Sequence, residues 1–111
     1  MKAITVFTPT YNRAYILERL YKSLCAQTNL DFEWLLIDDG STDDTAQLAH
    51  RFIAENKIKI TYHFQENKGM VGAHNTAHHL MTTPLCVCID SDDYMPADAI
   101  QKILAFWDQQ I

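Results

Sequence analysis

Three carboxylates lie close together near the end of this chain, in the segment Asp90-Ser91-Asp92-Asp93. They directly follow the apolar run Leu85–Ile89, which has the length and composition of a buried strand. Carboxylates crowded at the end of such a strand repel one another, and a divalent cation removes this repulsion. Hard cations such as Mg²⁺ and Mn²⁺ take oxygen ligands. The segment therefore predicts a metal site, with Asp92 as the best candidate ligand and Asp90 and Asp93 beside it.

A second acidic turn, Asp38-Asp39-Gly40-Ser41, follows the apolar run Trp34–Ile37. A carboxylate here can accept a hydrogen bond from a ring N–H of a base. Uracil presents such a donor at N3 and cytosine does not, so Asp39 is a candidate for selecting uracil. The alternative is a turn followed by an acidic helix N-terminus. That alternative explains Asp43 and Asp44 well, but not a pair of aspartates at the end of an apolar strand.

The segment Thr8-Pro9-Thr10-Tyr11-Asn12-Arg13 follows the first apolar run of the chain. Tyr11 offers a flat face on which a base can stack, and Thr8 and Thr10 offer hydroxyl groups. The other interpretation is the start of a helix, in which Thr10 or Asn12 is the cap and Tyr11 packs. Both interpretations stay open for this segment alone.

The segment from Glu66 to Asn75 contains two glycines and a lysine, which suits a phosphate-binding loop before a helix. It has neither the spacing of a P-loop nor that of a dinucleotide fingerprint. His74 and His78 lie one helical turn apart and could bind a metal, but a polar, partly exposed helix face is the favoured interpretation.

Alternating strands and helices must position these segments. We expect strands at 3–8, ending before Pro9, and at 32–37, 58–64 and 85–89, with 58–64 nearer an edge. Four helices are expected. The first spans about 14–27, the second begins after a cap at Thr42 or Asp43, the third spans about 71–81, and the fourth begins at Pro96. This alternation predicts a mainly parallel α/β sheet in a Rossmann-like three-layer sandwich. Ligands of such sheets bind beyond the carboxyl ends of the strands, where the strand order reverses.

Composition narrows the class of protein. The 111 residues suit one domain, and the formal charge of −5 argues against a broad contact with nucleic acid. Cys25, Cys86 and Cys88 have no disulfide or zinc spacing, so we expect small buried residues in a reduced compartment. The sequence shows no signal peptide and no apolar stretch long enough for a membrane span, and membrane association is not indicated. A cytoplasmic location is therefore expected.

Taken together and in this order, the four segments resemble the nucleotide-binding part of family 2 glycosyltransferases, which have the GT-A fold. The resemblance rests on Thr8–Arg13, on Asp38–Asp43, on Asn67-x-Gly69 followed by Ala73-His74-Asn75, and on Asp90–Asp93 before a helix near Pro96. It covers essentially the whole chain, residues 1–111. The family transfers a sugar from a nucleotide donor to an acceptor hydroxyl.

The resemblance implies roles for individual residues. Tyr11 would stack on the base, Asp39 would recognise its edge, and Asp92 would bind Mn²⁺ or Mg²⁺ bridging the diphosphate of the donor. The implied nucleotide-binding residues are Thr8, Pro9, Tyr11, Asp38, Asp39 and Asp90. The implied phosphate or sugar contacts are Arg13, Lys68, Gly69, His74 and Asn75, and the implied metal ligands are Asp92, Asp90 and Asp93.

Such enzymes usually continue past the acidic segment into an acceptor site and a catalytic base. We therefore expect a truncated, donor-binding half of a glycosyltransferase, with the base beyond residue 111. The chain alone should bind a UDP-sugar weakly and transfer sugar poorly or not at all. Phe106, Trp107 and Ile111 could then form an exposed apolar surface and cause self-association.

Three other classes of protein share some of these sequence features. A phospho-acceptor receiver domain would place its acidic pair after the first strand, where this chain has Thr8-Pro9. A nucleotidyltransferase would show a glycine-rich, basic loop at that point. A non-catalytic nucleotide-binding module differs from a donor-binding half only in whether a longer natural chain exists, and this alternative stays open.

Overall fold

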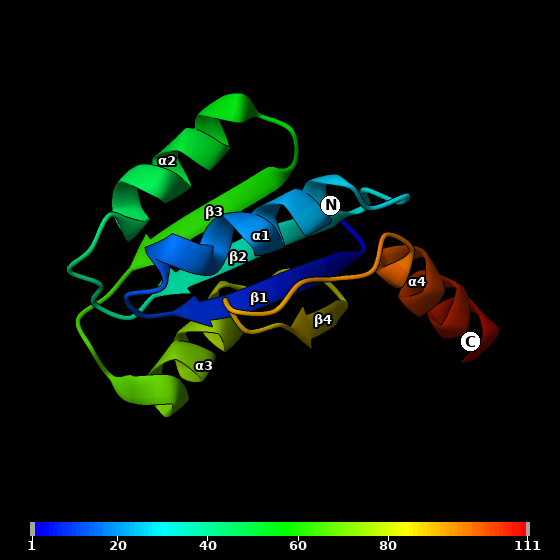
Figure 1. Cartoon of the computed structure of the whole chain (residues 1–111). Coiled ribbons are helices and arrows are strands. Elements are labelled where there is room, and N and C mark those ends of the chain that lie inside the picture. Colours follow the sequence, from blue (N-terminus) through cyan, green and yellow to red (C-terminus); the bar gives the residue numbers. More distant parts are fainter. Residues whose placement is uncertain (1, 111) are drawn as a thin grey trace.

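The computed structural model describes residues 2–110 and has one parallel sheet with helices on both faces (Figure 1). The elements in chain order are β1 (Ile4–Thr10), α1 (Ala14–Cys25), β2 (Phe32–Asp38), α2 (Thr45–Glu55), β3 (Lys59–Phe64), α3 (Gly69–Leu80), β4 (Leu85–Cys88) and α4 (Ala99–Gln110). The strand order is β3-β2-β1-β4, and all three pairings are parallel. The predicted α/β class and parallel sheet are confirmed.

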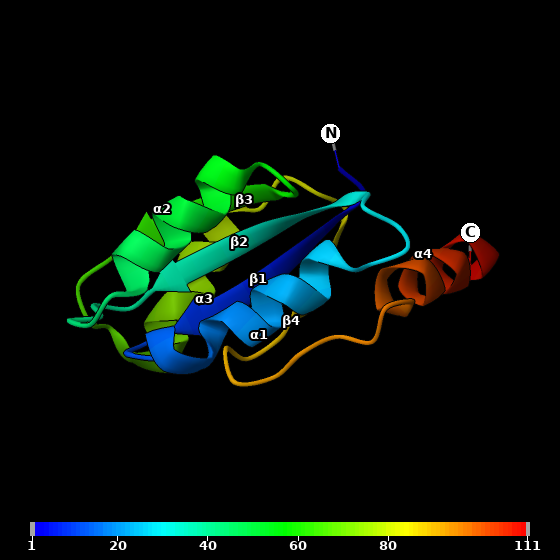
Figure 2. The same cartoon turned by 45° about the horizontal axis from the view of Figure 1, so that its top comes forward.

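Side chains of the two central strands alternate between the two faces of the sheet, as the pleat requires. Val6 and Trp34 are buried on the face covered by α1 and α2, while Phe7 and Leu35 are buried on the face covered by α3. Figures 1 and 2 show these layers from two directions. The expected three-layer sandwich is therefore present.

Pro9 does not end the first strand, which continues to Thr10 and pairs there with Asp38. The Thr10 carbonyl accepts the Asp39 N–H at 2.9 Å, so the backbone groups of Thr10 face β2. In a parallel strand the neighbouring residue faces the other way. Pro9 therefore faces the side of β4, and pairing with β4 already ends at Cys88, so no ladder hydrogen bond is lost.

The last strand is an edge strand, and the prediction that it is fully buried was wrong. Leu85 and Val87 are half-buried against the core under α1, whereas Cys86 and Cys88 are exposed on the opposite face. α3 packs over β1 and β2 and leaves that side of β4 uncovered. The prediction of three buried cysteines was therefore wrong for these two, and Cys25 is half-buried. The expected edge position of β3 is confirmed.

Helix boundaries differ from the predicted ones by a few residues. α1 ends at Cys25, α3 begins two residues earlier than expected, and α4 begins at Ala99 rather than at Pro96. Pro96 instead accepts the Ala99 N–H in the turn that starts α4. Helix ends depend on local hydrogen bonds as well as on the apolar stripe, which explains these shifts.

α4 lies apart from the sheet, at the end of an extended segment (Figures 1 and 2). Its first turn is anchored, because Ile100 is fully buried in the core. Further along, Phe106 and Trp107 are 64% and 41% exposed. Ile111, which was predicted to join them, lies outside the described residues. None of the described helices is long and apolar enough to cross a membrane.

Candidate functional site

A pocket of about 400 Å³ lies beyond the carboxyl ends of β1, β2 and β4. The strand order reverses between β1 and β4, so the pocket is where open parallel sheets bind ligands. We call it the switch-point pocket. It is lined by Pro9, Thr10, Tyr11, Arg13, Asp39, Asn67, Gly69, Met70, Ala73, Asp90, Ser91 and Asp92. Segments that are far apart in the sequence thus meet at one site, as predicted.

The end of β1 and the segment after it contribute Pro9 and Tyr11 to the pocket, but not Thr8. The Tyr11 ring is 48% exposed and free to contact a ligand. Thr8 is fully buried, and its hydroxyl accepts the indole N–H of Trp34 at 2.9 Å. Thr8 and Trp34 both belong to the face of the sheet under α1, so the Thr8 side chain does not reach the pocket.

Asp38 supports the turn after β2 from inside the protein. It is fully buried, and its carboxylate accepts hydrogen bonds from the Ser41 N–H at 2.8 Å and from the Tyr62 hydroxyl. Burial and the hydrogen bond to this carboxylate raise the pKa of Tyr62. Asp38 does not line the switch-point pocket. It stabilises the turn that places the next residue, Asp39, in the pocket.

Asp39 lines the pocket and links β2 to the segment before α3. Its carboxylate accepts hydrogen bonds from the Gln65 side chain at 3.0 Å, the Lys68 N–H at 2.8 Å and the Gly69 N–H at 2.9 Å. Burial would raise the pKa of Asp39, but these hydrogen bonds outweigh it and lower the pKa below its usual value. A carboxylate has about four acceptor positions. Three are used here, so one remains for a ligand.

Asn12 fastens the first two loops of the site to each other. Its backbone has a positive φ of 53°, and its side-chain oxygen accepts the Thr42 N–H at 2.8 Å. The Asn12 N–H in turn donates to the Ser41 hydroxyl at 2.8 Å. Asp43 adds a second connection, because its carboxylate accepts the Ala14 N–H at the start of α1. It also accepts the Thr45 N–H, so of the two residues proposed as the cap of α2, Asp43 is the one that bonds the helix.

Of the predicted phosphate or sugar contacts, Arg13 and Gly69 line the pocket and the other three do not. Lys68 contributes through its backbone N–H, which binds Asp39. His74 packs edge-on against Phe7, with the ring centres 4.9 Å apart, and Asn75 is exposed on α3. Within the described residues, His74 and His78 belong to no group of three or more side chains placed to hold a metal.

Several lining residues were not singled out from the sequence. Asn67, Met70, Ala73 and Ser91 all face the pocket. Asn67 also lies against Gly40, where an added Cβ would be 3.0 Å from the Asn67 N. Asn67 and Ala73 belong to the pattern Asn67-x-Gly69 followed by Ala73-His74-Asn75, which gave a signal for both. The apolar Met70 gave none, because nothing local distinguishes it from residues of the α3 packing stripe.

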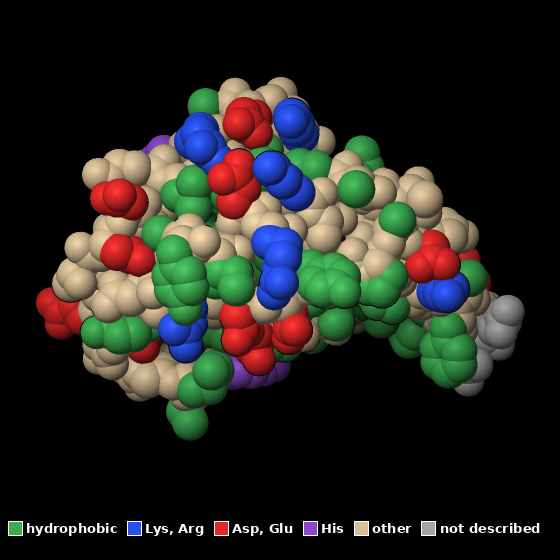
Figure 3. Space-filling model, viewed as in Figure 1, with side chains coloured by type: hydrophobic (Ala, Val, Ile, Leu, Met, Phe, Trp, Pro, Cys, Tyr) green, Lys and Arg blue, Asp and Glu red, His purple; other side chains and the backbone are tan. Residues whose placement is uncertain are grey.

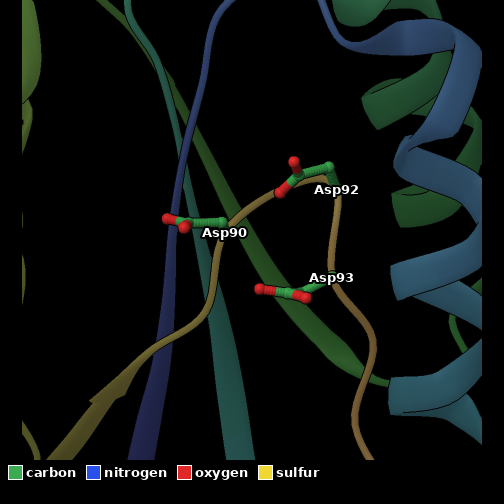
Figure 4. Close-up of side chains that lie close together, drawn as sticks. All are labelled: Asp90, Asp92 and Asp93. Carbon is green, nitrogen blue, oxygen red and sulfur yellow. The ribbon is translucent and has the colours of Figure 1, made fainter.

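The carboxylates of Asp90, Asp92 and Asp93 form the acidic triad of the site. One oxygen from each lies within 4.8 Å of the others, and all three side chains are exposed. A turn closed by the Asp93 N–H and the Asp90 carbonyl, 3.0 Å apart, brings them together. Figure 4 shows the Asp92 and Asp93 carboxyl groups directed back toward Asp90. Three carboxylates at this spacing fit a hard divalent cation.

The acidic triad belongs partly to the pocket and partly to the surface beside it. Asp90 and Asp92 line the pocket, whereas Asp93 belongs to the triad but does not line the pocket. Figure 3 shows acidic side chains gathered at the lower edge of the face, with basic and hydrophobic side chains directly above them. A diphosphate would be repelled by such a surface unless a cation lay between the two.

The fold and site define an α/β domain of the GT-A class. The family model of "Glycosyl transferase family 2" matches residues 5–110, and this chain belongs to that family. Among curated relatives, validoxylamine A glucosyltransferase of Streptomyces hygroscopicus subsp. jinggangensis is 36% identical over 106 residues, which cover 92% of this chain and 25% of the relative. Chondroitin synthase of Escherichia coli is 35% identical over 101 residues, covering 91% and 15%.

Solved structures agree with this assignment. TarS of S. aureus (residues 1–349) in complex with UDP matches with a TM-score of 0.89 and 30% identity, over 98% of this chain and 32% of that one. The mannosyltransferase PcManGT of Pyrobaculum calidifontis, in complex with GDP-Man and Mn²⁺, matches with a TM-score of 0.84 and 28% identity, over 94% and 31%. The chain thus spans a third or less of the length of these relatives.

Proposed function

We propose that this chain is the donor-binding part of a glycosyltransferase and binds a UDP-sugar with the help of a divalent cation. One observation carries the proposal: a single pocket at the switch point combines an exposed aromatic ring, a buried acceptor and an acidic triad. The ring and the acceptor suit a base, and the acidic triad suits a metal that would hold a diphosphate. The relatives named above include proteins solved with UDP and with GDP-Man and Mn²⁺.

The base would lie between Tyr11 and Asp39. The exposed Tyr11 ring offers a stacking surface, and stacking works for any base. Asp39 adds selectivity, because its one remaining acceptor position suits a ring N–H such as that at N3 of uracil. Its lowered pKa keeps the carboxylate ionised, and thus an acceptor, at neutral pH.

The diphosphate would lie toward the acidic triad. Asp90, Asp92 and Asp93 would hold Mn²⁺ or Mg²⁺, which neutralises the charge that develops on a diphosphate leaving group. Arg13 lines the same pocket and supplies positive charge. Gly69 also lines it, and its backbone lets the phosphates come close. Gly69 has a φ of +77° with open space around it, so the backbone is accessible there.

Transfer of the sugar would need groups that lie beyond these residues. The relatives are three or more times as long as this chain, and the acceptor site and catalytic base are expected past residue 111. We therefore propose that the chain alone binds the donor weakly and transfers sugar poorly. Robust transfer to an acceptor by the purified chain would contradict this division of labour.

Calorimetric titration with UDP, with and without Mn²⁺, tests the proposal. We expect binding that requires Mn²⁺, that is lost in Asp92→Ala, and that is weaker for CDP, whose cytosine ring has no N–H to donate to Asp39. Asp98→Ala is the matched control, because Asp98 pairs with Lys102 at 3.1 Å and does not line the pocket. UDP binding that is indifferent to both Mn²⁺ and Asp92 would refute the metal role. Equal affinity for UDP and CDP would refute the role of Asp39.

A further inference from the structure

The acidic triad lies on a segment with no regular structure, between the end of β4 at Cys88 and the start of α4 at Ala99. The turn that carries the triad, from Asp90 to Asp93, closes only on itself. A metal site needs ligands held in a fixed arrangement by other groups. The contacts that hold this segment against the rest of the protein are therefore important for the site.

The Ile89 N–H donates to the Phe7 carbonyl at 3.0 Å, and the Thr28 N–H donates to the Ala97 carbonyl at 2.8 Å. The other contacts come from one stripe of side chains, on α1 and just beyond it. Arg19 donates to the Asp92 carbonyl. The Ser23 hydroxyl accepts the Met95 N–H at 3.0 Å, and the Gln27 side chain donates to the Pro96 carbonyl at 2.7 Å. Positions 19, 23 and 27 are four residues apart and so lie on the same side of a helix. The whole segment after the triad is thus fastened to α1.

Within this stripe, only Arg19 bonds the triad itself. Its guanidinium carbon lies 5.3 Å from the centre of the Tyr94 ring, so the group is held between a carbonyl and an aromatic face. Among the described residues it forms no ion pair with the triad carboxylates. Arg19 therefore fixes the backbone of Asp92 and leaves the carboxylate oxygens free for a cation.

We infer that Arg19 is a positioning residue for the metal site, acting through the backbone of Asp92 and the ring of Tyr94. The inference rests on the proposed function, since it assumes that the triad binds a cation. It has an unusual consequence. A positive charge near three carboxylates should by itself weaken cation binding. If positioning is the role of Arg19, its removal weakens binding, and if it acts only as a charge, its removal strengthens binding.

Direct Mn²⁺ titration, followed by the electron paramagnetic resonance signal of the free ion, tests this without any sugar donor. We expect Arg19→Gln to weaken Mn²⁺ binding roughly tenfold, as happens when a group that orients a metal ligand is lost. Arg19→Lys, which keeps a charge and a donor but not the planar contact with Tyr94, should fall between Arg19→Gln and the unaltered chain. Arg19 is exposed, so neither variant should lower the melting temperature appreciably.

Lys22→Gln is the matched control, because it removes the same charge from the same helix at an exposed side chain that makes no contact with the triad. It should leave Mn²⁺ affinity unchanged. Unchanged or tighter Mn²⁺ binding by Arg19→Gln, while Asp92→Ala abolishes binding, would overturn the role of Arg19 and leave the proposed function intact. No Mn²⁺ binding by the unaltered chain would overturn both.

Discussion

At the scale of single residues, the site depends on carboxylates with different tasks. Asp38 is buried and holds a turn, Asp39 is buried and keeps one acceptor position, and the acidic triad is exposed. Hydrogen-bond donors decide between these tasks. One donor binds each oxygen of Asp38, and three donors from residues 65, 68 and 69 hold Asp39. The exposed carboxylates of the triad are left for a cation. Identical side chains thus acquire different chemistry from their surroundings.

The lowered pKa of Asp39 makes a prediction about stability and pH. Because the pKa is lower in the folded than in the unfolded chain, ionised Asp39 stabilises the fold above the unfolded value of about 3.9, and this contribution is lost as the pH falls through the folded pKa. Asp39→Asn should therefore reduce the free energy of unfolding by roughly 1–3 kcal/mol at pH 7, since a buried N–H loses its acceptor.

Urea unfolding at pH 7 and near pH 3 measures this difference. The gap between Asp39→Asn and the unaltered chain should narrow at the lower pH. Asp108→Asn, at an exposed position on α4, serves as the control and should change stability little at either pH. A gap that stays constant between the two pH values would show that the charge of Asp39 contributes nothing to the fold.

At the scale of elements, the pocket is formed by loops that are fastened to one another. Asn12 ties the loop after β1 to the loop after β2, and Asp39 ties the loop after β2 to the start of α3. The stripe on α1 holds the segment after β4. Each loop is therefore positioned by its neighbours, and a substitution in one loop should alter the geometry of the pocket.

Gly40 is the position where this coupling is most sensitive. It has a φ of +89°, and an added Cβ would lie 3.0 Å from the Asn67 N. Gly40→Ala combines backbone strain with a clash against backbone, so it should destabilise the protein by about 1–3 kcal/mol and weaken UDP binding. Gly69→Ala is the comparison, since Gly69 has a φ of +77° but open space around its Cβ position.

Thermal unfolding and UDP titration of both variants separate the two effects. Strain alone should give equal losses of stability in the two variants, whereas the contact with Asn67 should make the Gly40 variant the worse of the two. Equal losses would show that the loop of Asn67 moves away freely and does not hold the turn.

At the scale of the whole molecule, α4 is the least integrated part. It extends away from the sheet (Figure 2), and its residues Phe106 and Trp107 are exposed. Exposed aromatic residues on a helix that lies apart from the body favour association between copies. We therefore predict that the chain self-associates at high concentration, and that Trp107→Glu shifts it toward the monomer.

Light scattering coupled to size-exclusion chromatography, over a range of concentrations, provides the measurement. Gln101→Glu adds the same charge to α4 away from the exposed aromatic pair and should not alter the mass. A monomer at every concentration would contradict the prediction.

The expected cytoplasmic location also belongs to this scale, and it stays a prediction.

The strand and helix order, the parallel sheet, the family and the meeting of the acidic segments at one sheet edge could all be predicted from the sequence. These follow from periodicity and from short motifs, which are local properties of the chain. The positions of individual side chains were harder to predict. Thr8 was expected at the nucleotide but points into the core, because β1 continues through Pro9 and the pleat decides which face each residue takes.

Other properties were decided only by the tertiary structure, because they depend on contacts between residues that are distant in the sequence. The sequence alone placed a carboxylate at position 39, but its three donors come from residues 65, 68 and 69, and they determine its ionisation and its free acceptor position. Arg19 lies 73 residues from its partner Asp92, and no local pattern connects them. The exposure of Cys86 and Cys88 likewise follows from which strands α3 covers. Local sequence sets the elements, and packing sets which side chains meet.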